Sequence, residues 1–155
     1  PEHTSGYEGF FHVQHIRGNV EATEVELLIR DFDRDRFEWR KNTIENGVRE
    51  FSKRYGLMIE LELTDQYYNM REKIEPLYYI VDIAKQAMQD AEVKPSITPV
   101  RGGTDGARLS YMGLPAPNLF TGGHNFHGRY EFIPINSMEK AVQVIVRIAE
   151  LCTKI

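Results

Sequence analysis

The order of apolar and polar residues predicts three strands and one long helix in the first half of the chain. Residues 9–17 (GFFHVQHIR) and 24–32 (EVELLIRDF) are rich in aromatic and β-branched side chains, and residues 57–63 (LMIELEL) alternate strictly. Between them, apolar residues fall on one helical stripe that starts after Asp33, a suitable N-cap, and ends at Gly56. This half is therefore predicted as β-β-α-β, with an antiparallel sheet that has one solvated face.

The second half has a different pattern, in which short apolar strands alternate with helices. The predicted elements are a helix over residues 76–91, a strand at 96–100 (SITPV), a helix over 104–112, a strand within 114–123 (LPAPNLFTGG), and a helix from Ser137 to Ile155. The last helix is apolar on most sides, so we expect it to be buried, together with Cys152. This order is typical of a doubly wound α/β layer with a largely parallel sheet, and the change of pattern places a boundary near Gln66.

Composition narrows the class of protein. A chain of 155 residues with 41% hydrophobic residues can bury a core. Its formal net charge of −4 argues against a general nucleic-acid binder, and because it has no long apolar run and no charged-then-apolar start, neither a membrane span nor an N-terminal leader is expected. Because Cys152 is the only cysteine, no internal disulfide is expected, and a reducing compartment such as the cytoplasm fits best.

The stretch TGGHNFHGRYE, residues 121–131, carries candidate metal ligands. His124, His127 and Glu131 share one loop, but they lack the helical spacing that places two imidazoles on one face. A hydrolytic zinc centre needs about three protein ligands, and a two-metal centre also needs a bridging carboxylate. From the residues alone, this loop is a ligand donor with an incomplete site.

Two further features suggest binding rather than catalysis. In the turn RGGTDG, Gly102 and Gly103 would let the backbone approach a ligand at the start of a helix, although a simple strand-to-helix turn capped by Thr104 or Asp105 is the favoured alternative. Arg30 lies at the end of a predicted strand, and a planar guanidinium there suits bidentate recognition of a carboxylate. Ser110 lies inside a predicted helix and lacks the glycine-flanked turn that exposes a serine nucleophile.

Four segments, taken in order, resemble one enzyme family. They are YEGFFHV with ATEVELLIRDFDRDRFEWRK, then DQYYNMREK, PVRGGTDGARLSYMGLPAPNLFTGG and EKAVQVIVRIAEL. They are similar to the co-catalytic zinc exopeptidases, a family that includes tripeptide aminopeptidases, aminoacylases, and carnosinase-like and carboxypeptidase-like enzymes. The resemblance covers essentially the whole chain and implies the C-terminal segment of a zinc aminotripeptidase, which releases the N-terminal residue from tripeptides. The family's His-x-Asp motif, bridging aspartate and Glu-Glu pair belong to an upstream part that is not in this sequence.

The resemblance also assigns roles to residues. His127 matches the last ligand of a centre with two zinc ions per active site, and Arg30 matches an arginine that reaches the substrate carboxylate. Gly103 and Thr104 match the turn that lines the substrate pocket, and Asn125 is a weaker match to an asparagine that contacts substrate. His124 has no counterpart among the ligands.

Finally, the resemblance implies a domain organisation. Residues 1–66 correspond to the second half of an α/β-sandwich lid, or dimerisation, domain, and residues 67–155 to the C-terminal half of a doubly wound catalytic domain. It therefore implies a cytoplasmic homodimer formed through the lid, and a segment that is inactive by itself because it has one ligand and no acid or base. The alternative is a non-catalytic module for dimerisation or small-molecule binding.

Overall fold

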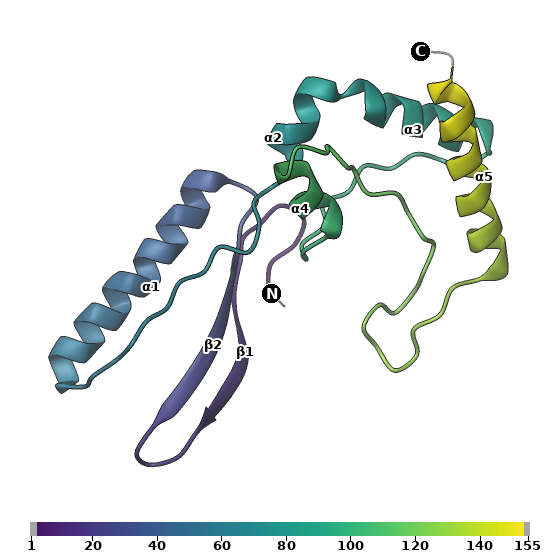
Figure 1. Cartoon of the computed structure of the whole chain (residues 1–155). Helices are drawn as coiled ribbons and strands as arrows, with labels where there is room; N and C mark the ends of the chain where they lie inside the picture. Colours follow the sequence, from purple (N-terminus) through teal and green to yellow (C-terminus); the bar gives the residue numbers. More distant parts are fainter. Residues whose placement is uncertain (1–2, 154–155) are drawn as a thin grey trace. The chain divides into compact units, whose positions relative to one another are not determined.

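The computed structural model describes residues 3–153, which divide into two compact units (Figure 1). The first unit contains residues up to Asn69 together with Thr98–Gly103. The second contains Met70–Ile97 and the residues from Thr104 onward. The chain thus passes from one unit to the other inside the glycine-rich turn, between Gly103 and Thr104. The lid and catalytic assignments of residues 1–66 and 67–155 stay predictions.

An antiparallel hairpin forms the sheet of the first unit (Figure 1). Strand β1 (Phe10–Gly18) pairs with β2 (Thr23–Arg30), and the register shifts between Val13 and His15. Such a shift accommodates an extra residue in one strand and bends it. The turn is held by the Asn19 side chain, which accepts hydrogen bonds from two backbone amides at 2.8 and 3.0 Å. The first two predicted strands are therefore confirmed.

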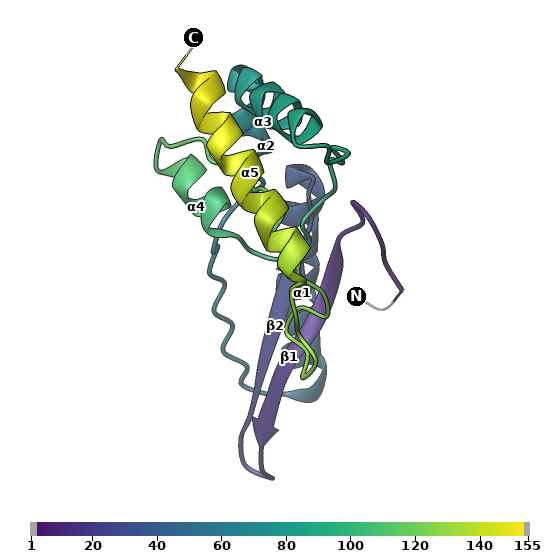
Figure 2. The ribbon, with the colours of Figure 1, turned by 90° about the vertical axis from the view of Figure 1, so that its right-hand side faces the viewer.

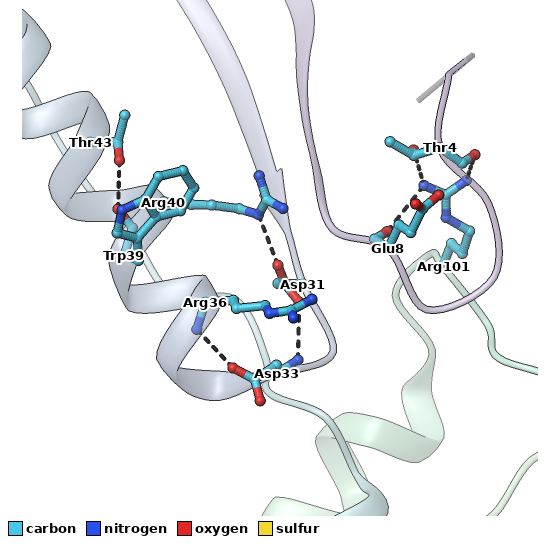
Figure 3. Close-up of polar contacts among 9 residues, drawn as sticks. All are labelled: Thr4, Glu8, Asp31, Asp33, Arg36, Trp39, Arg40, Thr43 and Arg101. Carbon is cyan, nitrogen blue, oxygen red and sulfur yellow. Dashed lines mark hydrogen bonds and ion pairs between the residues drawn. The ribbon is translucent and has the colours of Figure 1, made fainter.

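Helix α1 (Arg34–Tyr55) follows the hairpin and has both predicted caps. The Asp33 carboxylate accepts a hydrogen bond from the Arg36 amide at 2.8 Å (Figure 3), which satisfies a donor that the first turn leaves unpaired. Gly56 ends the helix with φ 64°, a left-handed conformation that glycine adopts without a Cβ clash. Both predictions depended on neighbours within a few residues, and both are confirmed.

The strand predicted at residues 57–63 is absent, and this prediction was wrong. The segment has no strand hydrogen bonds, and the apolar side chains of its predicted buried face remain exposed by 37% (Leu63) to 48% (Leu57). An alternating pattern selects a face, but a strand also needs a neighbour to receive its backbone bonds, and no segment within residues 3–153 supplies one. Residues 96–100 and 114–123 lack strand pairing for the same reason, so the described part has no parallel sheet.

The second unit is helical in its regular structure. It contains α2 (Arg71–Ile74), the 3-10 turn η1 (Glu75–Leu77), α3 (Tyr79–Asp90), α4 (Asp105–Tyr111) and α5 (Ile135–Cys152). Helices α3 and α5 lie side by side (Figures 1 and 2), joined by an ion pair of 2.6 Å between Arg147 Nε and Asp90 Oδ2. Ala87 and Val144, one on each helix, are 0% and 1% exposed, so the small core of this unit lies with these helices.

Helix α5 differs from its prediction at the start and in burial. It begins at Ile135, after Pro134, rather than at a Ser137 cap, and Ile155 lies outside the described residues. Val144 is its one buried residue, whereas Ile145 is 57% exposed and Cys152 is also exposed. The helix packs on α3 along one side, so apolar side chains on its other sides, such as Val142 (60%) and Val146 (52%), stay largely exposed within the described part of the chain. No helix between residues 3 and 153 combines the length and apolar character needed to cross a bilayer.

Candidate functional site

Arg30, the last residue of β2, is a half-buried cation whose guanidinium contacts hydrogen-bond acceptors and an aromatic ring. Its Nη1 donates to the Ile29 carbonyl at 3.2 Å, and its Nη2 donates to Gln66 Oε1 at 3.1 Å. Its Cζ lies 5.0 Å from the centroid of the Tyr67 ring, within the range of a cation–π interaction. Arg30 makes no ion pair with any residue between 3 and 153. The guanidinium, which has five N–H donors, is therefore held in place with donors left for an anion.

Arg40 shows how a structural arginine in the same unit differs. Its Nε donates to Asp31 Oδ2 at 2.8 Å, and the Asp31 side chain is only 1% exposed (Figure 3). Its Cζ also lies 5.2 Å from the centroid of the Phe11 ring. The charge of Arg40 is thus compensated inside the unit, whereas the charge of Arg30 is not.

Gly103 lies directly against Tyr67. A Cβ added at Gly103 would lie 2.5 Å from both Tyr67 Cζ and Tyr67 Oη, which is shorter than any ordinary contact. The Tyr67 hydroxyl is buried there without a hydrogen-bond partner among residues 3–153. The structure therefore shows a packing role for Gly103 beside Arg30, and its expected role in lining a substrate pocket stays a prediction.

Thr104 is the N-cap of α4, one of the two caps that the simpler interpretation of the turn allowed. Its Oγ1 accepts hydrogen bonds from the Ala107 amide and from Asn118 Nδ2, each at 3.2 Å. This hydroxyl therefore already acts as an acceptor inside the second unit. The predicted contact of Thr104 with substrate stays a prediction.

Ser110, in α4, is a structural residue. It is 2% exposed, its Oγ donates to the Gly106 carbonyl at 2.7 Å, and the same Oγ accepts from the Ala116 amide at 3.0 Å. A serine nucleophile must reach a substrate and have its proton removed by a base. Ser110 has neither property, which agrees with the sequence analysis, where it lacked the features of a serine nucleophile.

The histidine loop, residues 121–132, is closed by a short antiparallel bridge. The His124 amide donates to the Phe132 carbonyl at 2.8 Å, and the Phe132 amide donates back at 3.2 Å. The imidazole of His124 stacks on the Phe132 ring, with 4.9 Å between centroids and an interplanar angle of 16°. These contacts support the view of His124 as a loop residue rather than a ligand.

His127 lies at the tip of this loop in a left-handed conformation. Its φ is 63° and that of Asn125 is 55°, which is uncommon for residues other than glycine. The conformation is held by Glu131 Oε2, which accepts from the His127 amide at 3.0 Å, and by Asn125 Nδ2, which donates to the Tyr130 carbonyl at 3.1 Å. Glu131 thus orients the backbone of His127 and not its ring, and the His127 side chain is exposed.

Within residues 3–153, no group of three or more His, Cys, Asp or Glu side chains is placed to hold a metal ion. His127 can contribute one imidazole donor, but a zinc centre with protein ligands needs about three. The described residues therefore fit one position in a coordination shell and not a complete metal site.

The predicted site residues thus fall into three local groups. Arg30 and Gly103 meet through Tyr67 in the first unit, Thr104 caps α4 in the second, and Asn125 and His127 share one loop. Sequence reasoning did not identify Tyr67 or Gln66, which follow a segment without regular structure. No local pattern relates them to an arginine 36 residues earlier in the chain.

Comparison with known proteins agrees with this arrangement of elements. The chain is 56% identical over 155 residues to Peptidase T from Clostridium novyi (strain NT), covering 99% of this chain and 38% of that protein. It is 58% identical over 155 residues to Peptidase T from Caldanaerobacter subterraneus subsp. tengcongensis, again covering 99% of this chain and 38% of the relative. The chain thus spans about 38% of the length of these curated relatives.

A solved structure, that of aminopeptidase PepT from Bacillus cereus ATCC 10987, has a similar fold. It superposes with a TM-score of 0.64 at 18% identity, over 91% of this chain and 39% of that one. This similarity confirms the predicted mixed α/β class. Residues 10–151 match the model of Peptidase family M20/M25/M40, which is nearly the whole described chain. The chain therefore belongs to peptidase family M20/M25/M40.

Proposed function

We propose that the complete protein containing this chain is a zinc-dependent aminopeptidase that releases the N-terminal residue from tripeptides. The family and the names of the relatives, Peptidase T and aminopeptidase PepT, support a peptidase. In this proposal the chain contributes Arg30 to bind the C-terminal carboxylate of the substrate, and His127 as one of the zinc ligands. Gly103, Thr104 and Asn125 line the peptide site.

The observation that carries the proposal is the state of Arg30. Arg30 is a half-buried guanidinium with no carboxylate partner among the described residues, so its charge is available to pair with an anion. Its planar donors match a carboxylate in a bidentate pair. A peptide substrate has one carboxylate at its C-terminus, so binding by Arg30 fixes that end of the peptide.

A fixed carboxylate also explains a preference for tripeptides. Each added residue lengthens an extended peptide by about 3.3–3.6 Å. When the carboxylate is held at Arg30, the first peptide bonds of a dipeptide, tripeptide and tetrapeptide lie at different distances from it. Only one of these lengths brings its first peptide bond to a cleavage centre at a fixed place.

For the metal, the proposal assigns a limited role to this chain. When bound, a pair of zinc ions would supply Lewis-acid chemistry at the peptide carbonyl. His127 would hold one of these ions, while Glu131 and Asn125 fix the loop conformation that presents the imidazole. The remaining ligands and the acid–base group would come from the part of the protein outside this chain.

The proposal includes a cytoplasmic homodimer formed through the first domain. A single cysteine, exposed at the end of α5, suits a reducing compartment. In the first unit, Trp39 is 60% and Phe51 52% exposed. Helix α1 therefore has an apolar surface that a second subunit would cover in the proposed dimer. Sedimentation of the complete protein should give twice the monomer mass.

Hydrolysis of alanine peptides tests the proposed activity. We expect the complete protein to release the first alanine from trialanine much faster than from dialanine or tetraalanine, and to lose this activity to a chelator. Zinc should restore the activity. A complete protein that cleaves none of these peptides would contradict the proposal and favour a non-catalytic module. Equal rates on all three lengths would contradict its substrate assignment.

A further inference from the structure

We propose that Tyr67 is a positioning residue that holds Arg30 in the orientation needed to bind the substrate carboxylate. This inference rests on the proposed function of Arg30 and adds a residue to which no role has been assigned. Tyr67 does not touch the substrate in this account. It acts through the guanidinium, and its effect should therefore appear only with substrates that have a free carboxylate.

The guanidinium is held at two of its surfaces by consecutive residues. Arg30 Cζ lies over the Tyr67 ring, 5.0 Å from the ring centroid, and Gln66 accepts from Nη2 at 3.1 Å. An arginine side chain has many rotamers, and a bidentate pair requires one of them. A ring that restricts the guanidinium therefore lowers the entropy lost when a carboxylate binds.

The ring is itself held by Gly103. The place of a Cβ at this residue is occupied by Tyr67, since Cζ and Oη both lie 2.5 Å from it. The close approach of the Gly103 backbone thus supports the side of the tyrosine that carries the hydroxyl. This arrangement links two residues of the predicted peptide site, Arg30 and Gly103, through a third residue that sequence patterns did not reveal.

The aromatic ring, and not the hydroxyl, is the part of Tyr67 that acts. The hydroxyl is buried and has no hydrogen-bond partner in the described part of the chain, so removing it breaks no bond there. The neighbouring Tyr68 differs, because its hydroxyl donates to Asp65 Oδ2 at 2.7 Å. Phenylalanine should therefore replace Tyr67 in function, whereas an aliphatic residue should not.

The test compares two substrates in the complete protein, namely trialanine and trialanine amide. The ratio of their kcat/KM values measures recognition of the carboxylate and does not depend on the fraction of folded enzyme. We expect Tyr67→Leu to lower this ratio roughly three- to tenfold, mainly through the KM for trialanine, as loss of a partly desolvated cation–π contact implies. Tyr67→Phe should stay within about twofold of the wild type, since it keeps the ring.

A matched control comes from the same unit. Tyr55, at the other end of α1, lies under Arg54 at 5.5 Å from Cζ to ring centroid and is 55% exposed. Tyr55→Leu removes the same kind of contact and should leave the ratio unchanged. If Tyr67→Leu does not fold, Gly103→Ala displaces the ring instead of deleting it, and the same fall in the ratio is expected.

The outcomes separate this inference from the function on which it rests. An unchanged ratio in Arg30→Ala would refute the role of Arg30 and, with it, the role of Tyr67. A lowered ratio in Arg30→Ala combined with an unchanged ratio in Tyr67→Leu would refute Tyr67 alone. Equal losses on both substrates in Tyr67→Leu, or an equal fall of the ratio in Tyr67→Phe and Tyr67→Leu, would also overturn the proposal.

Discussion

The end of β2 and the histidine loop are both parts of the candidate site, but their completeness differs. At the end of β2, Arg30 lies over the Tyr67 ring and donates to the Gln66 amide oxygen, and both residues belong to the same unit. In the histidine loop, hydrogen bonds fix the backbone around His127, yet no group of three or more His, Cys, Asp or Glu side chains among the described residues is placed to hold a metal with it. The arginine is positioned by its own unit, whereas the histidine presents one donor.

The difference follows from what each ligand demands. A carboxylate can be bound by one guanidinium in the right orientation, so a short segment of chain can build its site. A zinc ion needs several donors at fixed distances, and these come from separate parts of a protein. One expects the carboxylate-binding part to survive in an isolated segment and the metal-binding part to depend on the complete protein.

The largest expected effect is the loss of all activity when the chain stands alone. The isolated 155-residue chain should not cleave trialanine at any zinc concentration, because one imidazole neither holds a catalytic metal nor replaces a general base. Assay of the purified chain beside the complete protein checks this. Turnover by the pure chain that a chelator abolishes would show that the metal-binding part is complete after all.

Substitution of Arg30 comes next. In the complete protein, Arg30→Ala should lower kcat/KM for trialanine about a hundredfold, because a charge-assisted pair to the substrate is lost. Arg30→Lys should recover only part of this, since an ammonium cannot reproduce the planar fork. Steady-state kinetics on both variants measure the effect. Wild-type kinetics in Arg30→Ala would identify this residue as an ordinary surface arginine.

Substitution of Arg40 should change stability and not substrate recognition. Arg40→Ala leaves the Asp31 carboxylate, whose side chain is 1% exposed, without its partner at 2.8 Å. We expect a loss of about 2 kcal/mol in the free energy of unfolding, with an unchanged preference for trialanine over its amide. Arg49→Ala, at an exposed position of α1, is the control and should cost less than about 0.5 kcal/mol. If Arg40→Ala and Arg49→Ala cost the same stability, the ion pair of Arg40 would have no structural role, and the contrast drawn between Arg40 and Arg30 would fail.

The smallest effect concerns Asp65, close to Arg30's partner Gln66. The hydrogen bond from the Tyr68 hydroxyl, and then the bond from Lys41, hold the pKa of Asp65 below its ordinary value of 3.8. The same carboxylate raises the pKa of Lys41 above its ordinary 10.5. The pair therefore contributes stability between these two values. The contribution is lost as pH falls through the folded pKa of Asp65, or rises through that of Lys41.

Asp65→Asn should accordingly destabilise the complete protein by no more than about 1 kcal/mol at pH 7. Denaturant unfolding at a series of pH values measures this difference, which should shrink as the pH falls below 3.8. A difference that grows toward acid would contradict the assignment of the cluster.

The features that could be predicted from the sequence are those determined by residues close to them in the chain. The caps at Asp33, Gly56 and Thr104 are set by neighbours within about four residues; the first two were predicted, and Thr104 was one of two predicted candidates. The strand at residues 57–63 has the right pattern but no partner strand, so the pattern could not decide its structure. The prediction that helix α5 is buried failed for a similar reason. Its composition is apolar, but composition does not say which neighbouring segments are present to cover it.

The candidate site shows the same limit. Arg30 and His127 carry recognisable chemistry and were singled out from the sequence, along with a resemblance to the zinc exopeptidases. Tyr67 was not, because an aromatic residue in an irregular segment has no pattern that points to an arginine on a distant strand. Which residues hold a functional group in place is decided by tertiary contacts, and these appear only in the structure.

The most direct test of this account is the zinc content of two histidine variants of the complete protein. His127→Ala should lose one of two zinc equivalents and nearly all activity, because a donor to the metal is removed. His124→Ala should keep both equivalents and most of the activity, since that imidazole stacks on Phe132. Zinc lost from His124→Ala and retained in His127→Ala would contradict the central claim that His127 is this chain's metal ligand.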